Sequence, residues 1–199
     1  MGYRTNTGTI KATDVMKCHT NVLAFDGEWL DFLGEPEPNF YMVLSAQPGH
    51  GKTTFSLKFA NYLAGKFGRV VYITNEENEA RIKRKLQFIG DRINPNFEMA
   101  FHADDFDKTI NLLKRGRFDY VFIDSAQNAG MDFKELAVIR KQFPNIGIVA
   151  ISRQTKDGKT RGSQNKEYDG DITIKFTTQG VATVVKNRFG EVGKEFILF

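Results

Sequence analysis

One short segment carries the residue types of a phosphate-binding loop. Residues 45–55 read SAQPGHGKTTF, in which Gly51, Lys52 and Thr53 fit the pattern Gly-x-x-x-x-Gly-Lys-Ser/Thr, although Ala46 stands at the first glycine. Such a loop offers backbone N–H groups and a helix N-terminus to phosphates, a lysine charge to the β- and γ-phosphates, and a hydroxyl to Mg²⁺. The alternative is a glycine-rich turn with an exposed lysine. The predicted nucleotide-binding residues are Ala46, Gln47, Pro48, Gly49, His50, Gly51, Lys52, Thr53 and Thr54.

Two acidic segments could complete such a site. Asp124 ends the apolar run YVFID, and a carboxylate at that edge of a sheet could hold Mg²⁺ together with Thr53. Glu76, in YITNEEN, could deprotonate the attacking water, and Glu77 competes with it for that role. The alternative for both glutamates is the acidic first turn of a helix, where they would favour the helix dipole.

Apolar runs that alternate with helical patterns must position these residues. Continuous apolar strands separated by helices predict a parallel sheet that is buried on both faces. The expected strands are residues 40–46, 69–74, 97–103, 119–126 and 146–152, and the expected helices are residues 52–63, 78–90, 106–115 and 133–143.

The pattern changes after residue 152. Residues 153–170 are polar, contain glycine and lack apolar periodicity, which predicts a long mobile loop. Three closing strands are expected at residues 171–176, 180–187 and 194–199. The predicted fold is therefore α/β, with a mostly parallel central sheet flanked by helices and an antiparallel C-terminal end. We expect one domain over residues 1–199, with residues 1–25 as an N-terminal extension.

Composition sets broad limits on function. The chain has 199 residues, of which 41% are hydrophobic, and it contains no apolar run near the roughly 20 residues that a membrane span needs. Its single cysteine, Cys18, excludes an internal disulfide, and the polar N-terminus is unlike a signal peptide. A cytoplasmic protein without a membrane partner is expected. The net charge of +4 permits a nucleic-acid partner but fits general solubility equally well.

From about residue 26 to its end, the chain resembles the RecA-like P-loop ATPase core, especially the RadA, KaiC and DnaB branch. SAQPGHGKTT is similar to the phosphate loop of that branch, in which DnaB-type helicases also place alanine first. VVYITNEEN resembles the strand with the catalytic glutamate, which maps onto Glu76, and VFIDSAQ resembles the magnesium strand with Asp124. The resemblance implies ATP and Mg²⁺ as cofactors.

The segment KNRFG, residues 186–190, matches a RadA-type motif letter for letter. The resemblance implies that Lys186 and Arg188 reach the nucleotide of a neighbouring subunit in a head-to-tail homo-oligomer, either a ring or a filament. The alternative is a solvated turn. Family members carry Gln or His at the sensor position after VAIS, whereas this chain has Arg153 followed by Gln154, and either residue could contact the γ-phosphate.

In the family, two loops contact single-stranded DNA, and they correspond to residues 127–133 and 156–169. A groove that binds single-stranded DNA needs cationic side chains for the phosphates and flat aromatic side chains for the bases. Met131 could add an apolar face, and a disordered surface loop is the alternative for residues 156–169. A second basic cluster, RIKRK at residues 81–85, is expected on a solvated helix face. The candidate DNA-binding residues are Phe133, Lys156, Lys159, Arg161, Lys166 and Tyr168.

The expected function is that of a core-only ATPase that acts on single-stranded DNA in recombination or strand annealing, and the chain resembles the small core-only ATPases of phage recombination systems and of the archaeal RadB type. Two alternatives remain open. The first is a DnaB-like replicative helicase motor, and the second is a nucleotide-gated scaffold or regulator without a DNA role.

Overall fold

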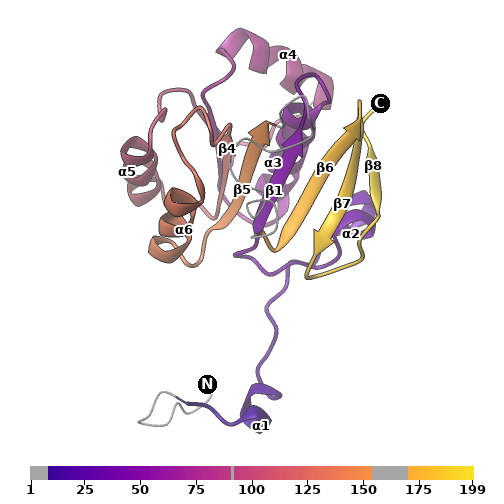
Figure 1. Ribbon diagram of the computed structural model, residues 1–199, viewed down its shortest axis with the longest axis vertical. Helices are drawn as coiled ribbons and strands as arrows, with labels where there is room; N and C mark the ends of the chain where they lie inside the picture. Colours follow the sequence, from indigo (N-terminus) through magenta and orange to yellow (C-terminus); the bar gives the residue numbers. More distant parts are fainter. Residues whose placement is uncertain (1–8, 91, 154–169) are drawn as a thin grey trace.

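The structure, a computed structural model, describes residues 9–90, 92–153 and 170–199. One mixed sheet with the strand order β3-β2-β4-β5-β1-β6-β7-β8 forms its centre (Figure 1). The strands are β1 (Tyr41–Ala46), β2 (Val70–Thr74), β3 (Phe97–Ala100), β4 (Tyr120–Asp124), β5 (Gly147–Arg153), β6 (Ile172–Thr178), β7 (Val181–Asn187) and β8 (Glu195–Ile197). The helices are α1 (Ala12–Val15), α2 (Gly27–Leu33), α3 (Lys52–Lys66), α4 (Glu79–Ile89), α5 (Phe106–Gly116) and α6 (Phe133–Gln142).

The pairing of the strands confirms the predicted fold class. All pairs from β3 through β2, β4, β5 and β1 to β6 are parallel. β7 pairs antiparallel with both β6 and β8, which gives the antiparallel C-terminal end. Because the parallel strands share one direction, their carboxyl ends meet along a single edge of the sheet.

Helices cover both faces of the sheet and create two hydrophobic cores (Figure 1). On one face, α2, α3 and α4 bury side chains such as Trp29, Phe59 and Ile82. On the other face, α5 and α6 bury side chains such as Leu113 and Ile139. The near-continuous apolar runs of the central strands follow from this double coverage.

Helix α2 was not among the expected elements. Trp29, Phe32 and Leu33 lie three and four residues apart on one side of this short helix, and all three are buried. Leu23 and Phe25, just before α2, are also buried in the same core. By contrast, α1 lies away from the sheet at the end of an extended segment (Figure 1).

Several elements differ from their expected bounds by a few residues. β3 ends at residue 100 rather than 103, and α3 continues to residue 66 rather than 63. Within the described part of the chain, no helix is both long and apolar enough to cross a bilayer.

Candidate nucleotide site

The phosphate-type loop lies between the end of β1 and the start of α3, at the carboxyl edge of the sheet. Gly49 and Gly51 have φ angles of +84° and +97°, a left-handed region in which a side chain would be strained. Gly51 is the N-cap of α3 and no side chain caps this helix end, so its first backbone N–H groups can receive an anion.

Ala46 occupies the end of β1, where the usual pattern has glycine. Its side chain is fully buried and belongs to the hydrophobic core, and its backbone pairs with Arg153 and Phe176. The methyl group therefore has a place in the packing. This explains why the loop keeps its form without the leading glycine.

Thr53 and Asp124, which the sequence predicted as metal ligands, lie in direct contact. Thr53 Oγ1 donates a hydrogen bond to Asp124 Oδ2 at 3.1 Å. Tyr72 Oη donates to the same oxygen at 2.8 Å, and the Ser56 hydroxyl lies 2.8 Å from Tyr72 Oη. All of these side chains are buried, so a polar cluster is enclosed beneath the loop.

Burial governs the electrostatics of this cluster. Desolvation raises the pKa of Asp124, although the hydrogen bond from Tyr72 acts in the opposite direction, and the charge of Glu76 raises it further. Asp124 Oδ1 is buried and has no hydrogen-bond partner within the described residues. A buried carboxylate oxygen beside a threonine hydroxyl offers the hard oxygen donors that Mg²⁺ prefers, so these residues fit the ion.

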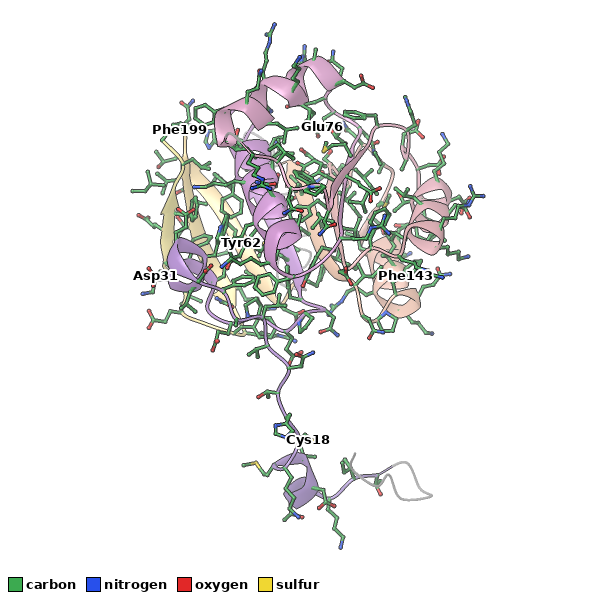
Figure 2. The ribbon with its side chains drawn as sticks, turned by 180° about the vertical axis from the view of Figure 1, so that it is seen from behind. Cys18, Asp31, Tyr62, Glu76, Phe143 and Phe199 are labelled. Atoms are coloured by element: carbon green, nitrogen blue, oxygen red, sulfur yellow. The ribbon has the colours of Figure 1, made fainter. Side chains whose placement is uncertain are left out.

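A cavity of about 390 Å³ opens beside the loop. Glu76 lies on its wall, at the same end of the molecule as α4 (Figure 2). The residues that line the cavity are Pro48, Gly49, Gly51, Lys52, Thr53, Thr54, Glu76, Glu77, Arg81, Lys85 and Phe199. The predicted phosphate-binding residues and both candidate glutamates therefore share one cavity.

The two glutamates have different surroundings. Glu77 forms an ion pair with Lys85 of α4, and its backbone N–H donates to Thr74 Oγ1 at 3.4 Å. Glu76 is close enough to Asp124 to influence the pKa of that carboxyl. Lys85 therefore connects Glu77 to α4, and the charges of both glutamates act on the buried cluster, Glu76 on Asp124 and Glu77 on Tyr72.

The loop is supported from the β6–β7 side. His50 Nδ1 lies 3.3 Å from the Phe176 carbonyl oxygen, and Gly180 N–H donates to the His50 carbonyl at 3.1 Å. The imidazole therefore contacts the end of β6 and does not extend freely into solvent. Leu198 N–H in turn donates to the Gly180 carbonyl at 2.9 Å, which places the last residues of the chain beside the cavity.

Sequence comparisons give RadA proteins, although no family model matches the chain. The chain is 30% identical over 172 residues to the DNA repair protein RadA of Brucella abortus, which covers 75% of this chain and 37% of that protein. It is 26% identical over 177 residues to the DNA repair protein RadA of Streptococcus pyogenes, with 79% and 38% covered. The chain thus spans well under half the length of these relatives.

Two solved structures share the fold. The flagellar accessory protein FlaH of Methanocaldococcus jannaschii superposes with a TM-score of 0.67 over 89% of this chain and 93% of that chain, at 12% identity. The second, a solved ATPase domain, gives a TM-score of 0.59 over 91% of this chain and 89% of that chain, at 15% identity.

The chain has a RecA-like P-loop ATPase core.

In this RecA-like core, Lys186 and Arg188 lie far from the loop of their own chain. β7 runs antiparallel to β6, so Lys186 pairs with Thr173 near the start of β6 and Arg188 follows. Since Thr173 pairs with Val43, and Asp171 bonds to both Arg188 and Tyr41, Lys186 lies about 10 Å and Arg188 about 17 Å from the level of Ala46 along the strands. Neither residue lines the cavity beside the loop.

Several predicted positions of the RecA-like core have no structural description. The backbone of Arg153 ends β5 beside Ala46, but its side chain and that of Phe133 are not described. Met131, expected to offer a face to bases, is only 3% exposed and packs in the core, so that expectation is wrong. The predicted residues outside the described ranges are Gln154, Lys156, Lys159, Arg161, Lys166 and Tyr168.

Four residues of the nucleotide site were not predicted from the sequence. Tyr72 and Ser56 look like ordinary members of an apolar strand and a helix. Nothing in the sequence marks the contact of Tyr72 with Asp124 or that of Ser56 with Tyr72. Arg81 and Lys85 were expected on a solvated helix face, yet they line the cavity. Their spacing of four residues, which puts both side chains on one face of α4, was the available signal.

Proposed function

We propose that this chain hydrolyses ATP with Mg²⁺ as a subunit of a head-to-tail homo-oligomer, and that it binds single-stranded DNA in recombination or strand annealing. One observation carries the catalytic part. Thr53 and Asp124 are in contact at 3.1 Å beneath a cavity that Lys52 and Glu76 also line.

The phosphate-binding roles follow from position. The N–H groups at the start of α3 and the Lys52 ammonium would bind the phosphate oxygens of ATP. Thr53 Oγ1 and Asp124 Oδ1 would hold Mg²⁺, which supplies positive charge to the β- and γ-phosphate oxygens when it is bound. Lys52 is only 6% exposed, which favours a strong interaction with an anion in the cavity.

Glu76 is the proposed general base. Its carboxylate would accept a proton from the attacking water as the bond from that water to the γ-phosphorus forms and the bond to ADP breaks. Glu77, which pairs with Lys85 and lines the same cavity, is the second candidate.

Lys186 and Arg188 are proposed to act on the nucleotide of the neighbouring subunit. Their place at the sheet edge opposite the loop supports this, since a head-to-tail contact joins opposite edges of adjacent subunits. A cation delivered in trans stabilises charge on the γ-phosphate and is worth ~10³–10⁵ in rate in other NTPases.

DNA binding is proposed from the relatives. The two RadA proteins are named as DNA repair proteins, and the candidate DNA-contacting segments here are residues 127–133 and 156–169. Residues 127–133 lie between the end of β4 and the first turn of α6, whereas residues 156–169 are outside the described ranges.

The test is ATP hydrolysis by the full chain, with and without single-stranded DNA, over a series of salt concentrations. Lys52→Ala and Glu76→Gln are the inactive variants, and Glu79→Gln, an exposed glutamate in the first turn of α4, is the matched control. We expect DNA to stimulate hydrolysis, the stimulation to weaken as salt rises, and hydrolysis to disappear in the two inactive variants only.

Other outcomes favour the alternatives. Unwinding of forked duplexes with a defined polarity would favour a DnaB-like helicase motor over a recombinase. Hydrolysis that ignores DNA, with no DNA retained in the presence of a non-hydrolysable ATP analogue, would contradict the DNA role and favour a nucleotide-gated scaffold.

A further inference from the structure

A cluster of charged residues surrounds Asp171 at the sheet edge opposite the loop. Arg188 Nη1 donates a hydrogen bond to Asp171 Oδ1 at 3.0 Å. The other oxygen, Oδ2, accepts one bond from Arg140 Nη2 at 3.3 Å and another from the Tyr41 backbone N–H at 3.0 Å. Asp171 therefore joins β1, α6 and the segment after β7.

The Asp171 carboxylate is fixed by more contacts than a carboxylate in an exposed surface ion pair. Its side chain is only 10% exposed, and both oxygens are used. Two backbone bonds fix the same residue, because Asp171 N–H donates to the Tyr41 carbonyl at 2.7 Å and Arg188 N–H donates to the Asp171 carbonyl at 3.1 Å. A nearly buried carboxylate with several charge-assisted bonds has little freedom to move.

The Arg188 guanidinium, by contrast, faces outward. Its side chain is 62% exposed although one end contacts Asp171. A guanidinium has five N–H donors in a fixed planar fork, and Asp171 accepts from only Nη1 within the described residues. The contact therefore holds one end of the fork while most of the side chain stays exposed.

Arg140 supports the carboxylate from the other side. Its guanidinium lies over the ring of Tyr41, with Cζ 4.9 Å from the ring centre, and this contact fixes the arginine against β1. One carboxylate between two arginines leaves one positive charge in the cluster, so the group as a whole still attracts an anion.

We propose that Asp171 is the positioning residue for Arg188, which it aims at the phosphates of the nucleotide on the neighbouring subunit. The inference rests on the proposed function, because it gives Arg188 a task in trans. It goes further by assigning Asp171, with Arg140 behind it, to that task. A displacement of the arginine by about 1 Å would lower the catalytic rate about a hundredfold. This sensitivity is the physical reason for a residue that fixes its position.

The first measurement is the steady-state hydrolysis of ATP by the full-length variant Asp171→Asn. Asparagine keeps the size of the side chain and an acceptor for the Tyr41 N–H, but it removes the charge that orients Arg188. We expect kcat to fall about tenfold to a hundredfold while KM for ATP changes less than about twofold. In the Arg188→Ala background the same substitution should have almost no further effect.

The second measurement is complementation in mixed oligomers. Glu76→Gln subunits keep the arginine cluster, and Asp171→Asn subunits keep the catalytic glutamate. An equal mixture should be more active than either variant alone, because about a quarter of interfaces are intact. A mixture of Arg188→Ala with Glu76→Gln serves as the reference pair.

The outcomes separate the two proposals. If the reference pair complements but Asp171→Asn has wild-type activity, or is impaired and fails to complement Glu76→Gln, Asp171 does not position Arg188 and the proposed function stands. If Arg188→Ala hydrolyses ATP as fast as wild type, the role of Arg188 in trans is wrong, and the role of Asp171 falls with it.

Discussion

At the scale of single residues, the site combines a buried acid with groups that would hold it ready for a cation. Asp124 is fully buried, and its Oδ2 accepts hydrogen bonds from both Thr53 and Tyr72. Even so, desolvation dominates and raises the pKa of the Asp124 carboxyl. The charge at this position therefore costs stability, which is the usual consequence of keeping a functional group in the interior.

This cost predicts the effect of Asp124→Asn on stability. The folded protein binds the Asp124 proton more tightly than the unfolded chain does, so stability falls as pH rises through the window between the two pKa values. Asparagine removes that loss. We expect the variant to have a higher Tm than wild type at neutral pH, with no difference at acidic pH where the wild-type carboxyl is protonated in both states.

Calorimetry over a pH series checks this prediction. For a chain of this size, a change of about 1 kcal/mol in the free energy of unfolding shifts Tm by roughly 2–4 °C. Asp31→Asn is the control, because Asp31 is an exposed carboxyl on α2 and lies outside the Asp124 cluster. A lower Tm for Asp124→Asn at neutral pH would show that the hydrogen bonds of this carboxylate outweigh its burial.

At the scale of elements, helix α4 begins at a capping residue that is recognisable in the sequence and carries two residues of the site. Asn78 caps this helix by accepting a hydrogen bond from the Arg81 N–H at 3.0 Å. The helix then carries Arg81 and Lys85 along the wall of the nucleotide cavity. The sequence predicted a helix over residues 78–90, and the structure has it from residue 79 to residue 89.

Loss of this cap should weaken the helix. Asn78→Ala removes the side-chain acceptor at the N-terminus of α4, and we expect the free energy of unfolding to fall by about 1 kcal/mol. Urea titration measures the change, which should appear as a lower midpoint at an unchanged slope. Asn78→Ser is the matched control, since serine caps helices about as well as asparagine, and an equal loss in both variants would rule out capping as the cause.

At the scale of the whole molecule, an aromatic cluster joins an early helix, α2, to the last strand, β8. Trp29 of α2 stacks on Phe196 of β8 at 4.8 Å between ring centroids and packs against Phe59 of α3 at 4.7 Å. The contacts pack α2 against β8, the edge strand of the sheet, although the two elements are far apart in sequence (Figure 1).

Truncation of Trp29 should therefore destabilise the entire molecule. Trp29 is 3% exposed, and Trp29→Ala should lower the free energy of unfolding by about 3–5 kcal/mol, with a smaller loss for Trp29→Phe. Denaturant unfolding followed by far-ultraviolet circular dichroism is the suitable measurement. Phe88→Ala is the control, because Phe88 is 63% exposed and its loss should change stability by less than about 0.5 kcal/mol.

The sequence alone determined the features that depend on neighbours along the chain. Gly49, Gly51 and Lys52 define a loop whose form follows from local backbone freedom and from the helix that it opens. Apolar runs ending in Asp124 and Thr74 predicted strands that end at one edge of a sheet, because parallel strands share a direction. These local rules sufficed for the fold class and for the members of the candidate site on the cavity wall.

Only the tertiary structure decided which distant residues meet. Tyr72 contacts Asp124 because β2 and β4 are adjacent in register, and Asp171 binds Arg140 and Arg188 because α6, β6 and β7 converge at one edge. Met131 is buried although its loop is polar around it. The physical reason is that burial and hydrogen bonding between separate segments depend on the final packing of the sheet, which no spacing within a single segment encodes.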